Sequence, residues 1–532
     1  MGCGENHRVC FSTYFQLSPR LHDGVHSDLK QQQNSTIKKH LIMINLSLIS
    51  PEITLFCGAL LILMADVFLG KKIPNFFYAS RLLSLVICAV TINIIVSNFT
   101  KAELLFSNMY LSNTFTSFVK AILVGLLTIV IAFSSRFVFS NQKISAEFIA
   151  LLMIATTGGM ILISSNDFLT FYLGLELQAL SLYLLAALNR NSAKSSEAGM
   201  KYFILGCLAS GILLFGISMI YGFSGTTNFL NLMNLYHNGV TAEIPVGVMF
   251  GFVMVLTAMF FKISAAPFHM WSPDVYEGSA SIVTTFFATV VKFSAVMILL
   301  RLFSSLIIGW PGIEKIFVFT SMASLAVGSF GAIFQKNLKR LLAYSSIGHI
   351  GFILLGMAAF GREAWIACMV YMVIYAIISV GSFGFLILIR GNNDETVGYE
   401  TDEENEKIFS INALSGLAKT NPYMAFSLAV LMFSTAGIPP LAGFFSKFYI
   451  LTAAIAHGYL ITSIIAVLFS VVSAYYYLRI VKVMYFDEPQ NLMKLDCVNN
   501  VKAMIFVTAL FNLGLIFFLN SFVNSIANFA GL

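Results

Sequence analysis

A small set of charged side chains lies inside stretches of this sequence that are otherwise almost wholly apolar. They are Lys120, Glu176, Lys201, Lys262, Lys292 and Lys447, with Asp66 and His349 as weaker candidates. A charge at the centre of a bilayer costs about 2.5 to 3.5 kcal/mol on insertion scales, so a functional role is the default interpretation. A lysine removed from water loses the solvation of its charged form and can then load and release a proton. These residue types therefore indicate a path for protons.

Each candidate also has a structural explanation. Lys120 and Lys201 fall near the ends of apolar stretches, where a long side chain can extend its ammonium group to the membrane surface. Asp66 is close to an end and is expected to be interfacial. His349, in "YSSIGHIGF", fits a hydrogen-bonded packing residue as well as a proton carrier. The functional interpretation is favoured for Glu176, Lys262, Lys292 and Lys447.

A proline accompanies the first of the favoured lysines. The segment "FKISAAPFHMW" places Pro267 five residues after Lys262. Proline lacks the backbone N–H and displaces the carbonyl four residues earlier, so this one would free the carbonyl of Ile263. A free carbonyl in hydrocarbon is tolerated only where protein or water meets it. The sequence therefore predicts a broken helix and a polar, hydrated pocket beside the lysine.

The same arrangement occurs a second time in "FSTAGIPPLAGFFSKF". Pro439 and Pro440 would free two carbonyls, Gly437 loosens the turn, and Lys447 follows two turns later. The apolar stretch 424–456 would span about 50 Å as one straight helix, which exceeds a bilayer of about 30 Å. A break at the prolines explains this excess length.

Composition identifies the class of protein that must position these residues. Hydrophobic residues make up 58% of the 532 residues and charged residues only 11%, whereas soluble domains carry about 25% charged residues. The net charge of +6 is spread over short loops, which excludes a nucleic-acid surface. Seven scattered cysteines without a C-x-x-C pair, and the lack of a glycine-rich phosphate loop, predict no metal, haem, iron–sulfur cluster or nucleotide in this chain.

The apolar stretches predict an all-α polytopic membrane protein with about fourteen transmembrane helices, at about 20 residues a helix. The expected centres are Leu60, Ala89, Leu126, Ile154, Ala179, Ile212, Met254, Ala288, Ala323, Phe352, Tyr375, Gly437, Val467 and Leu510. Basic residues mark cytoplasmic loops. The even-numbered loops carry only Lys101, Arg301, Lys315 and Arg362, so odd-numbered loops are cytoplasmic and both ends of the helical body face outward.

The two proline-broken helices are the seventh and the twelfth. They are five helices apart and cross the membrane in opposite directions, which is the geometry of two inverted five-helix repeats with discontinuous helices at the ion sites. The expected organisation is a disordered tail or misassigned start at 1–42, three helices at 43–140, the first repeat at 141–310, the second at 311–490 with an acidic loop at 390–420, and a last helix at 491–532.

Several segments carry a resemblance to a known family. "DFLTFYLGLELQALSLYLLAAL", "PFHMWSPDVYEG" and "KRLLAYSSIGHIGFILLG" resemble the subunit N family of bacterial respiratory complex I, the proton-translocating NADH:quinone oxidoreductase, which is related to mitochondrial NADH dehydrogenase subunit 2. The resemblance covers nearly everything from Met43 onwards. "PFHMWSPDVYEG" is the most specific segment, because the sister subunits L and M and cation antiporter subunits usually lack its Val-Tyr pair.

The resemblance implies an antiporter-like subunit that holds no cofactor and pumps protons. NADH, FMN, iron–sulfur clusters and quinone would belong in or near other subunits, and subunits M, K, J and A, with the lipid bilayer of the bacterial inner membrane, would be partners. By motif, Glu176 and Lys262 match the family's glutamate–lysine pair, Lys292 its central lysine, and Lys447 the lysine towards the outer exit.

Three matches are less complete. Lys201 matches a further family lysine of less certain role, and His349 joins the expected relay. Where the family usually has proline before the central lysine, this chain has Val291, and "SASIV" replaces a proline-containing segment, so the local shape of the eighth helix stays open. Two other functions are kept: a subunit of a multi-component sodium/proton antiporter, and a passive membrane scaffold whose lysines bind lipid or pair internally.

Overall fold

The computed structural model describes most of the chain. The described residues are 46–70, 76–134, 146–189, 192–236, 244–303, 310, 312–390, 406–490, 493–495 and 498–529. The predicted tail at 1–42 and residues 391–405 of the acidic loop lie outside them. The chain divides into two units, Met1–Ser47 and Leu48–Leu532, and the packed helices belong to the second.

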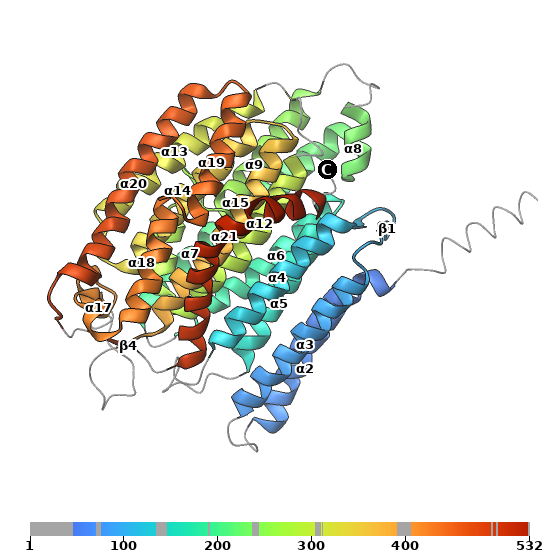
Figure 1. Cartoon of the computed structure of the whole chain (residues 1–532). Helices are drawn as coiled ribbons and strands as arrows, with labels where there is room; N and C mark the ends of the chain where they lie inside the picture. The colour runs from blue at the N-terminus through green and yellow to red at the C-terminus, as the bar shows by residue number, and fades with distance from the viewer. Residues whose placement is uncertain are drawn as a thin grey trace, which may run out of the picture. The chain divides into compact units, whose positions relative to one another are not determined.

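The described chain is almost entirely helical (Figure 1). Its longer helices are α2 (Leu46–Leu69), α3 (Phe76–Ser97), α4 (Thr114–Phe133), α5 (Glu147–Ser164), α6 (Phe168–Ala186), α7 (Ala193–Ser224), α9 (Val246–Lys262), α12 (Lys292–Leu302), α13 (Ile313–Ile333), α14 (Leu338–Ala358), α15 (Arg362–Ile387), α18 (Pro422–Ala436), α19 (Ala442–Ala456), α20 (Leu460–Phe486) and α21 (Asn499–Phe529). The shorter ones are α8 (Phe229–Tyr236), α10 (Trp271–Gly278), α11 (Ser281–Phe286), the π-helix η2 (Phe287–Val291), the 3-10 helix η4 (Ile411–Leu414) and α17 (Leu417–Thr420).

Two small antiparallel sheets, which the sequence did not predict, complete the secondary structure. Strand β1 (Glu103–Leu105) pairs with β2 (Tyr110–Ser112), and β3 (Ile389–Arg390) pairs with β4 (Lys494–Leu495). Strands of two or three residues carry too little periodicity to be found in a sequence.

The predicted class, an all-α membrane protein, is confirmed. Within the described residues, twelve helices are long and apolar enough to cross a membrane. Helices suit the hydrocarbon interior of a membrane because their backbone N–H and C=O groups form hydrogen bonds with one another inside the same segment. Of the two remaining expected centres, Met254 lies on the shorter helix α9, of 17 residues, and Gly437 lies between α18 and α19, of 15 residues each.

The candidate site lies among the most buried helices. Residues 282–300, in α11, η2 and α12, are all buried, and most of α14 and α15 is buried as well. Figure 1 shows α12 and α15 among the other helices of the bundle. In the apolar stretches of α2, α3 and α20, by contrast, only 28% of the residues are buried. Charged groups on the inner helices are therefore held away from lipid.

A matching set of backbone hydrogen bonds occurs in both predicted repeats. In the first repeat, the chain at the start of α6 pairs with the segment that follows α7. In the second repeat, the chain at the start of α14 pairs with the segment that follows α15. The bonds are Phe168 N to Thr227 O (3.0 Å) and Phe229 N to Asn166 O (3.0 Å) in the first, and Leu338 N to Phe409 O (2.8 Å) and Ile411 N to Lys336 O (2.9 Å) in the second. This common register supports the inverted repeat, which stays a prediction.

Candidate functional site

The helix that carries Lys262 breaks earlier than the sequence predicted. Helix α9 ends at Lys262, five residues before Pro267, so the lysine ends the helix and does not lie within it. Ser264 has a positive φ of 61°, and the carbonyl of Phe261 accepts a hydrogen bond from Trp271 Nε1 at 2.8 Å. The helix therefore ends before Pro267 and not at it, and Ile263, whose carbonyl was expected to be freed, lies just beyond the end of α9.

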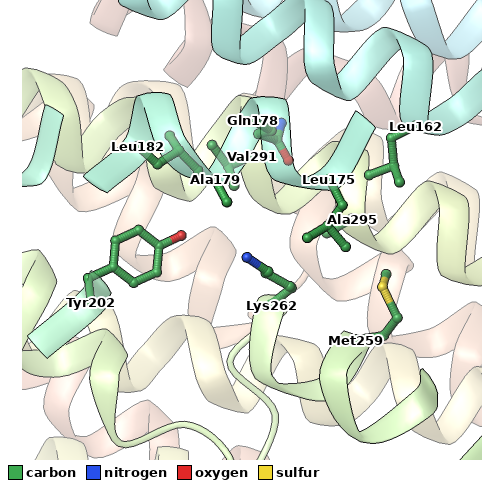
Figure 2. A pocket seen from close by; sticks show the side chains of 10 residues that line it. All are labelled: Leu162, Leu175, Gln178, Ala179, Leu182, Tyr202, Met259, Lys262, Val291 and Ala295. Carbon is green, nitrogen blue, oxygen red and sulfur yellow. The ribbon is translucent and has the colours of Figure 1, made fainter. Parts of the chain in front are cut away.

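The amine of Lys262 is buried and has no hydrogen-bond partner among the described residues. It lies 5.9 Å from the centre of the Tyr183 ring. Figure 2 shows it pointing into a gap with Tyr202 on one side and Leu175 on the other. The cavity there is about 10 Å³, room for roughly one water molecule. It is lined by Leu162, Leu175, Gln178, Ala179, Leu182, Tyr202, Met259, Lys262, Val291 and Ala295.

An unpartnered amine of this kind is unusual, because a charged lysine carries three donors and its burial without partners is costly. Two polar side chains, Gln178 and Tyr202, reach the same cavity. The Gln178 amide also donates to Ser294 Oγ at 3.1 Å. The arrangement can hold a water molecule between the amine and these groups, and such a water can exchange a proton with Lys262.

Glu176 lies half-buried on α6 and supplies a negative charge near this amine. Its carboxylate accepts a hydrogen bond from the Ser210 hydroxyl on α7, a partner that the sequence analysis missed. The carboxylate acts electrostatically on Lys262, although no hydrogen bond joins the two side chains within the described residues. The glutamate is thus near enough to bias the charge of the lysine without neutralising it in a closed ion pair.

Lys292 occupies the centre of the bundle and is 2% exposed. Its amine donates to Ser346 Oγ on α14 at 2.7 Å and lies 5.7 Å from the centre of the Tyr276 ring. The π-helix η2 ends at Val291, directly before the lysine. This answers the question of the eighth helix: without a proline, a π-helical turn displaces the chain at this point, and such turns are frequent at functional sites.

Lys447 closes the break in the second discontinuous helix. Helix α18 ends at Ala436, Gly437 follows with a φ of +87°, and α19 begins at Ala442. The Lys447 amine donates to the Ala436 carbonyl at 2.8 Å and to Ser470 Oγ at 3.0 Å. A carbonyl that the prolines leave without a helical partner is therefore bonded by the lysine itself.

His349 is buried on α14, with a tyrosine hydroxyl near each of its two ring nitrogens. Its Nδ1 is 2.7 Å from the Tyr371 hydroxyl, and its Nε2 is 3.4 Å from the Tyr477 hydroxyl. The charges of Lys292 and Lys447 both act on the ring. The histidine is therefore hydrogen-bonded, as one interpretation expected, and is also near enough to both lysines for their charges to act on it.

Lys201 does not lie with the buried lysines. Its side chain is 43% exposed and pairs with Glu197 at 2.7 Å and with Asp274 at 2.8 Å. Arg340 Nη1 lies 2.8 Å from Asp274 and 3.0 Å from Glu277. These groups surround an open cavity of about 290 Å³, with room for several water molecules. We call this the polar vestibule; it is lined by Lys194, Glu197, Ala198, Lys201, Asp274, Glu277, Gly278 and Arg340.

Successive residues of α7 line two cavities: Lys201 lines the polar vestibule and Tyr202 lines the cavity at Lys262. Tyr202 stacks on Trp271, with ring centroids 4.6 Å apart. In the short helix α10, burial alone would raise the pKa of Asp274. The bond from Lys201 and the charge of Arg340 outweigh burial and hold that pKa below its usual 3.8.

Two residues near the ends of apolar stretches, Lys120 and Arg301, differ from expectation. Lys120 is 3% exposed and its amine lies 2.6 Å from Glu52 Oε1, so the interfacial explanation for this lysine is wrong. Asp66 is half-buried on α2. Arg301, taken as a loop residue, lies in the last turn of α12 and donates to the carbonyl of Ile163. Among the described residues, no three His, Cys, Asp or Glu side chains converge as a metal site would require.

Comparisons with known proteins agree with this geometry. Residues 165–473 match the family described as NADH:quinone oxidoreductase/Mrp antiporter, transmembrane. NADH-quinone oxidoreductase subunit N of Paramagnetospirillum magneticum is 44% identical over 82% of this chain and 88% of its own length. Subunit N 1 of Rhizobium meliloti is 42% identical over 85% of this chain and 90% of its own length. A chain of Thermus thermophilus respiratory complex I, 25% identical, superposes with a TM-score of 0.73 over 89% of this chain and 99% of its own.

Proposed function

This chain belongs to the NADH-quinone oxidoreductase subunit N family, and we propose that it carries protons across the membrane along its buried Glu/Lys row. It is a membrane subunit of that translocating oxidoreductase. The observation that carries the proposal is the buried Lys262 amine, which has no hydrogen-bond partner among the described residues and faces a cavity of water size. A structural lysine would be paired, whereas a proton-loading one must be able to lose its charge.

The order of the groups suggests a direction. The polar vestibule at Lys201 would take up protons, and Tyr202 and a cavity water would pass them to Lys262 under the influence of Glu176. Transfer would continue to Lys292 and then, past His349, to Lys447. Moving one charge against 100 mV costs about 2.3 kcal/mol, which a change of charge at Glu176, set by a neighbouring subunit, can supply in a low-dielectric interior.

The family supports a more specific setting. We infer that the chain resides in a bacterial inner membrane, with both ends of its helical body on the periplasmic side. Subunit M and the small subunits K, J and A would be its partners, and NADH, FMN, iron–sulfur clusters and quinone would act in or near other subunits. The driving reaction would then be quinone reduction outside this chain.

Replacement of the central lysine tests the proposal. Lys292→Met in the assembled complex should lower the number of protons pumped per electron in inverted membrane vesicles oxidising NADH. Lys419→Met, which changes an exposed lysine, serves as the matched control and should pump normally. An unchanged ratio in the Lys292 variant would support the passive scaffold instead.

A second candidate is a multi-component cation/proton antiporter subunit, since the matching family includes Mrp antiporters. The two functions differ in their cation. Acidification that persists in sodium-free buffer favours the complex I subunit, and acidification that requires a sodium gradient favours the antiporter.

A further inference from the structure

A second group of buried charges lies outside the row just described. It consists of Glu52 on α2, Tyr110 on β2 and Lys120 on α4, each 3% exposed. We call it the outer triad, because it lies near loops of the even-numbered set, which are poor in basic residues. By the charge rule, these loops face outward, opposite to the polar vestibule.

The three side chains of the outer triad bond to one another. The Lys120 amine lies 2.6 Å from Glu52 Oε1 and donates to the Tyr110 hydroxyl at 2.6 Å. The Tyr110 hydroxyl in turn donates to Glu52 Oε1 at 2.8 Å. Both bonds to the carboxylate therefore fall on the same oxygen.

The other carboxylate oxygen, Glu52 Oε2, is buried and has no hydrogen-bond partner among the described residues. A carboxylate oxygen normally accepts bonds, and leaving it unsatisfied in the interior costs about 1 to 3 kcal/mol or more. A purely structural ion pair would satisfy both oxygens, as buried pairs must to be stable. The free oxygen is thus a position where a proton can bind without displacing an existing partner.

The outer triad is also connected to the proposed path. Helix α4, which carries Lys120, packs against η2 and α12, the segment that holds Lys292. Arg301, nine residues beyond Lys292, lies at the outward end of α12, and its charge acts on Lys120. Nine residues of helix advance about 14 Å, so α12 leads from the centre of the bundle towards the triad.

We propose that Glu52, Tyr110 and Lys120, in the segment that precedes the first repeat, form a proton-release site beside its α12, an inference that rests on the function proposed above. A proton arriving from the lysine row binds Glu52 Oε2 and neutralises the carboxylate, which leaves the Lys120 ammonium as an uncompensated positive charge. Repulsion between this charge and Arg301 favours loss of the proton from Oε2 to water at the outer face. The original ion pair then re-forms.

The test compares variants of the whole complex in inverted vesicles, with assembly followed by native gel electrophoresis and pumping expressed as protons per electron. Glu52→Gln keeps the shape of the side chain but binds no proton. The double variant Glu52→Gln/Lys120→Met removes both charges, so no charge is left buried alone. Lys101→Met, an exposed lysine at the same end, is the control.

The double variant should assemble and pump fewer protons per electron, with a loss no greater than that of Lys262→Ala, since protons can also continue from Lys292 to Lys447. Adding Glu52→Gln to Lys262→Ala should lower the ratio no further, because Lys262 precedes the outer triad on the path. Native pumping by the assembled double variant would overturn the inference and leave a structural ion pair. If Lys262→Ala alone also pumped normally, the proposed function would fail separately.

Discussion

Two lysine-to-methionine changes should have opposite effects on stability, because one lysine is paired and the other is not. The Lys262 amine has no hydrogen-bond partner among the described residues, so Lys262→Met removes a buried polar group that nothing satisfies. Such a group costs about 1 to 3 kcal/mol, and the stability of the subunit should stay the same or rise by that amount. Lys120 forms an ion pair with Glu52 at 2.6 Å, and breaking a buried pair costs about 3 to 5 kcal/mol.

The assay is heating of the purified complex, followed by native gel electrophoresis to find the temperature at which this subunit dissociates. Lys120→Met should dissociate at a clearly lower temperature than the native complex, and Lys262→Met should not. Equal losses of stability in the two variants would refute the reasoning, because they would mean that the Lys262 amine is paired in the native complex.

Three further changes follow from the geometry of the site. Gly437→Ala places a Cβ 3.0 Å from the Lys447 side chain at a φ of +87°, so pumped protons per electron should fall; native pumping would contradict this. Ser346→Ala removes the bond from Lys292, worth about 1.5 to 3 kcal/mol, and should slow pumping, whereas Ser346→Thr should restore it. The ion pairs of Asp274 hold the pKa of its carboxyl group below 3.8. The ionised carboxylate therefore stabilises the folded subunit above pH 3.8, and this stabilisation is lost as the pH falls through the lowered pKa. Asp274→Asn should therefore lower the dissociation temperature at pH 7 and not in strong acid.

The sequence predicted the membrane class and the burial of the amines of Lys262, Lys292 and Lys447, because a charge inside an apolar stretch is conspicuous. The partners of those charges were not predictable, because one sequence carries no distances between helices. Ser346 and Ser210 look like ordinary small polar residues in apolar helices, yet they bond to Lys292 and Glu176. Their roles depend on packing across more than thirty residues.

Residues near helix ends were the hardest to interpret. Lys120 and Lys201 have similar positions in their apolar stretches, but the first is buried against Glu52 and the second is in an open ion cluster. The difference depends on carboxylates 68 and 73 residues away, which periodicity does not connect. The break after Lys262 was placed too late for a related reason: Trp271 stabilises an earlier end of the helix by bonding the Phe261 carbonyl.

The central claim, that the buried lysines carry protons, is tested most directly by measuring protons pumped per electron in Lys262→Ala and Lys447→Ala complexes. The measurement uses NADH-driven acidification of inverted vesicles, with NADH oxidation recorded in the same sample and assembly checked beforehand. Both assembled variants should oxidise NADH while acidifying the vesicles less for each electron. A native ratio in both would contradict a proton path through these residues.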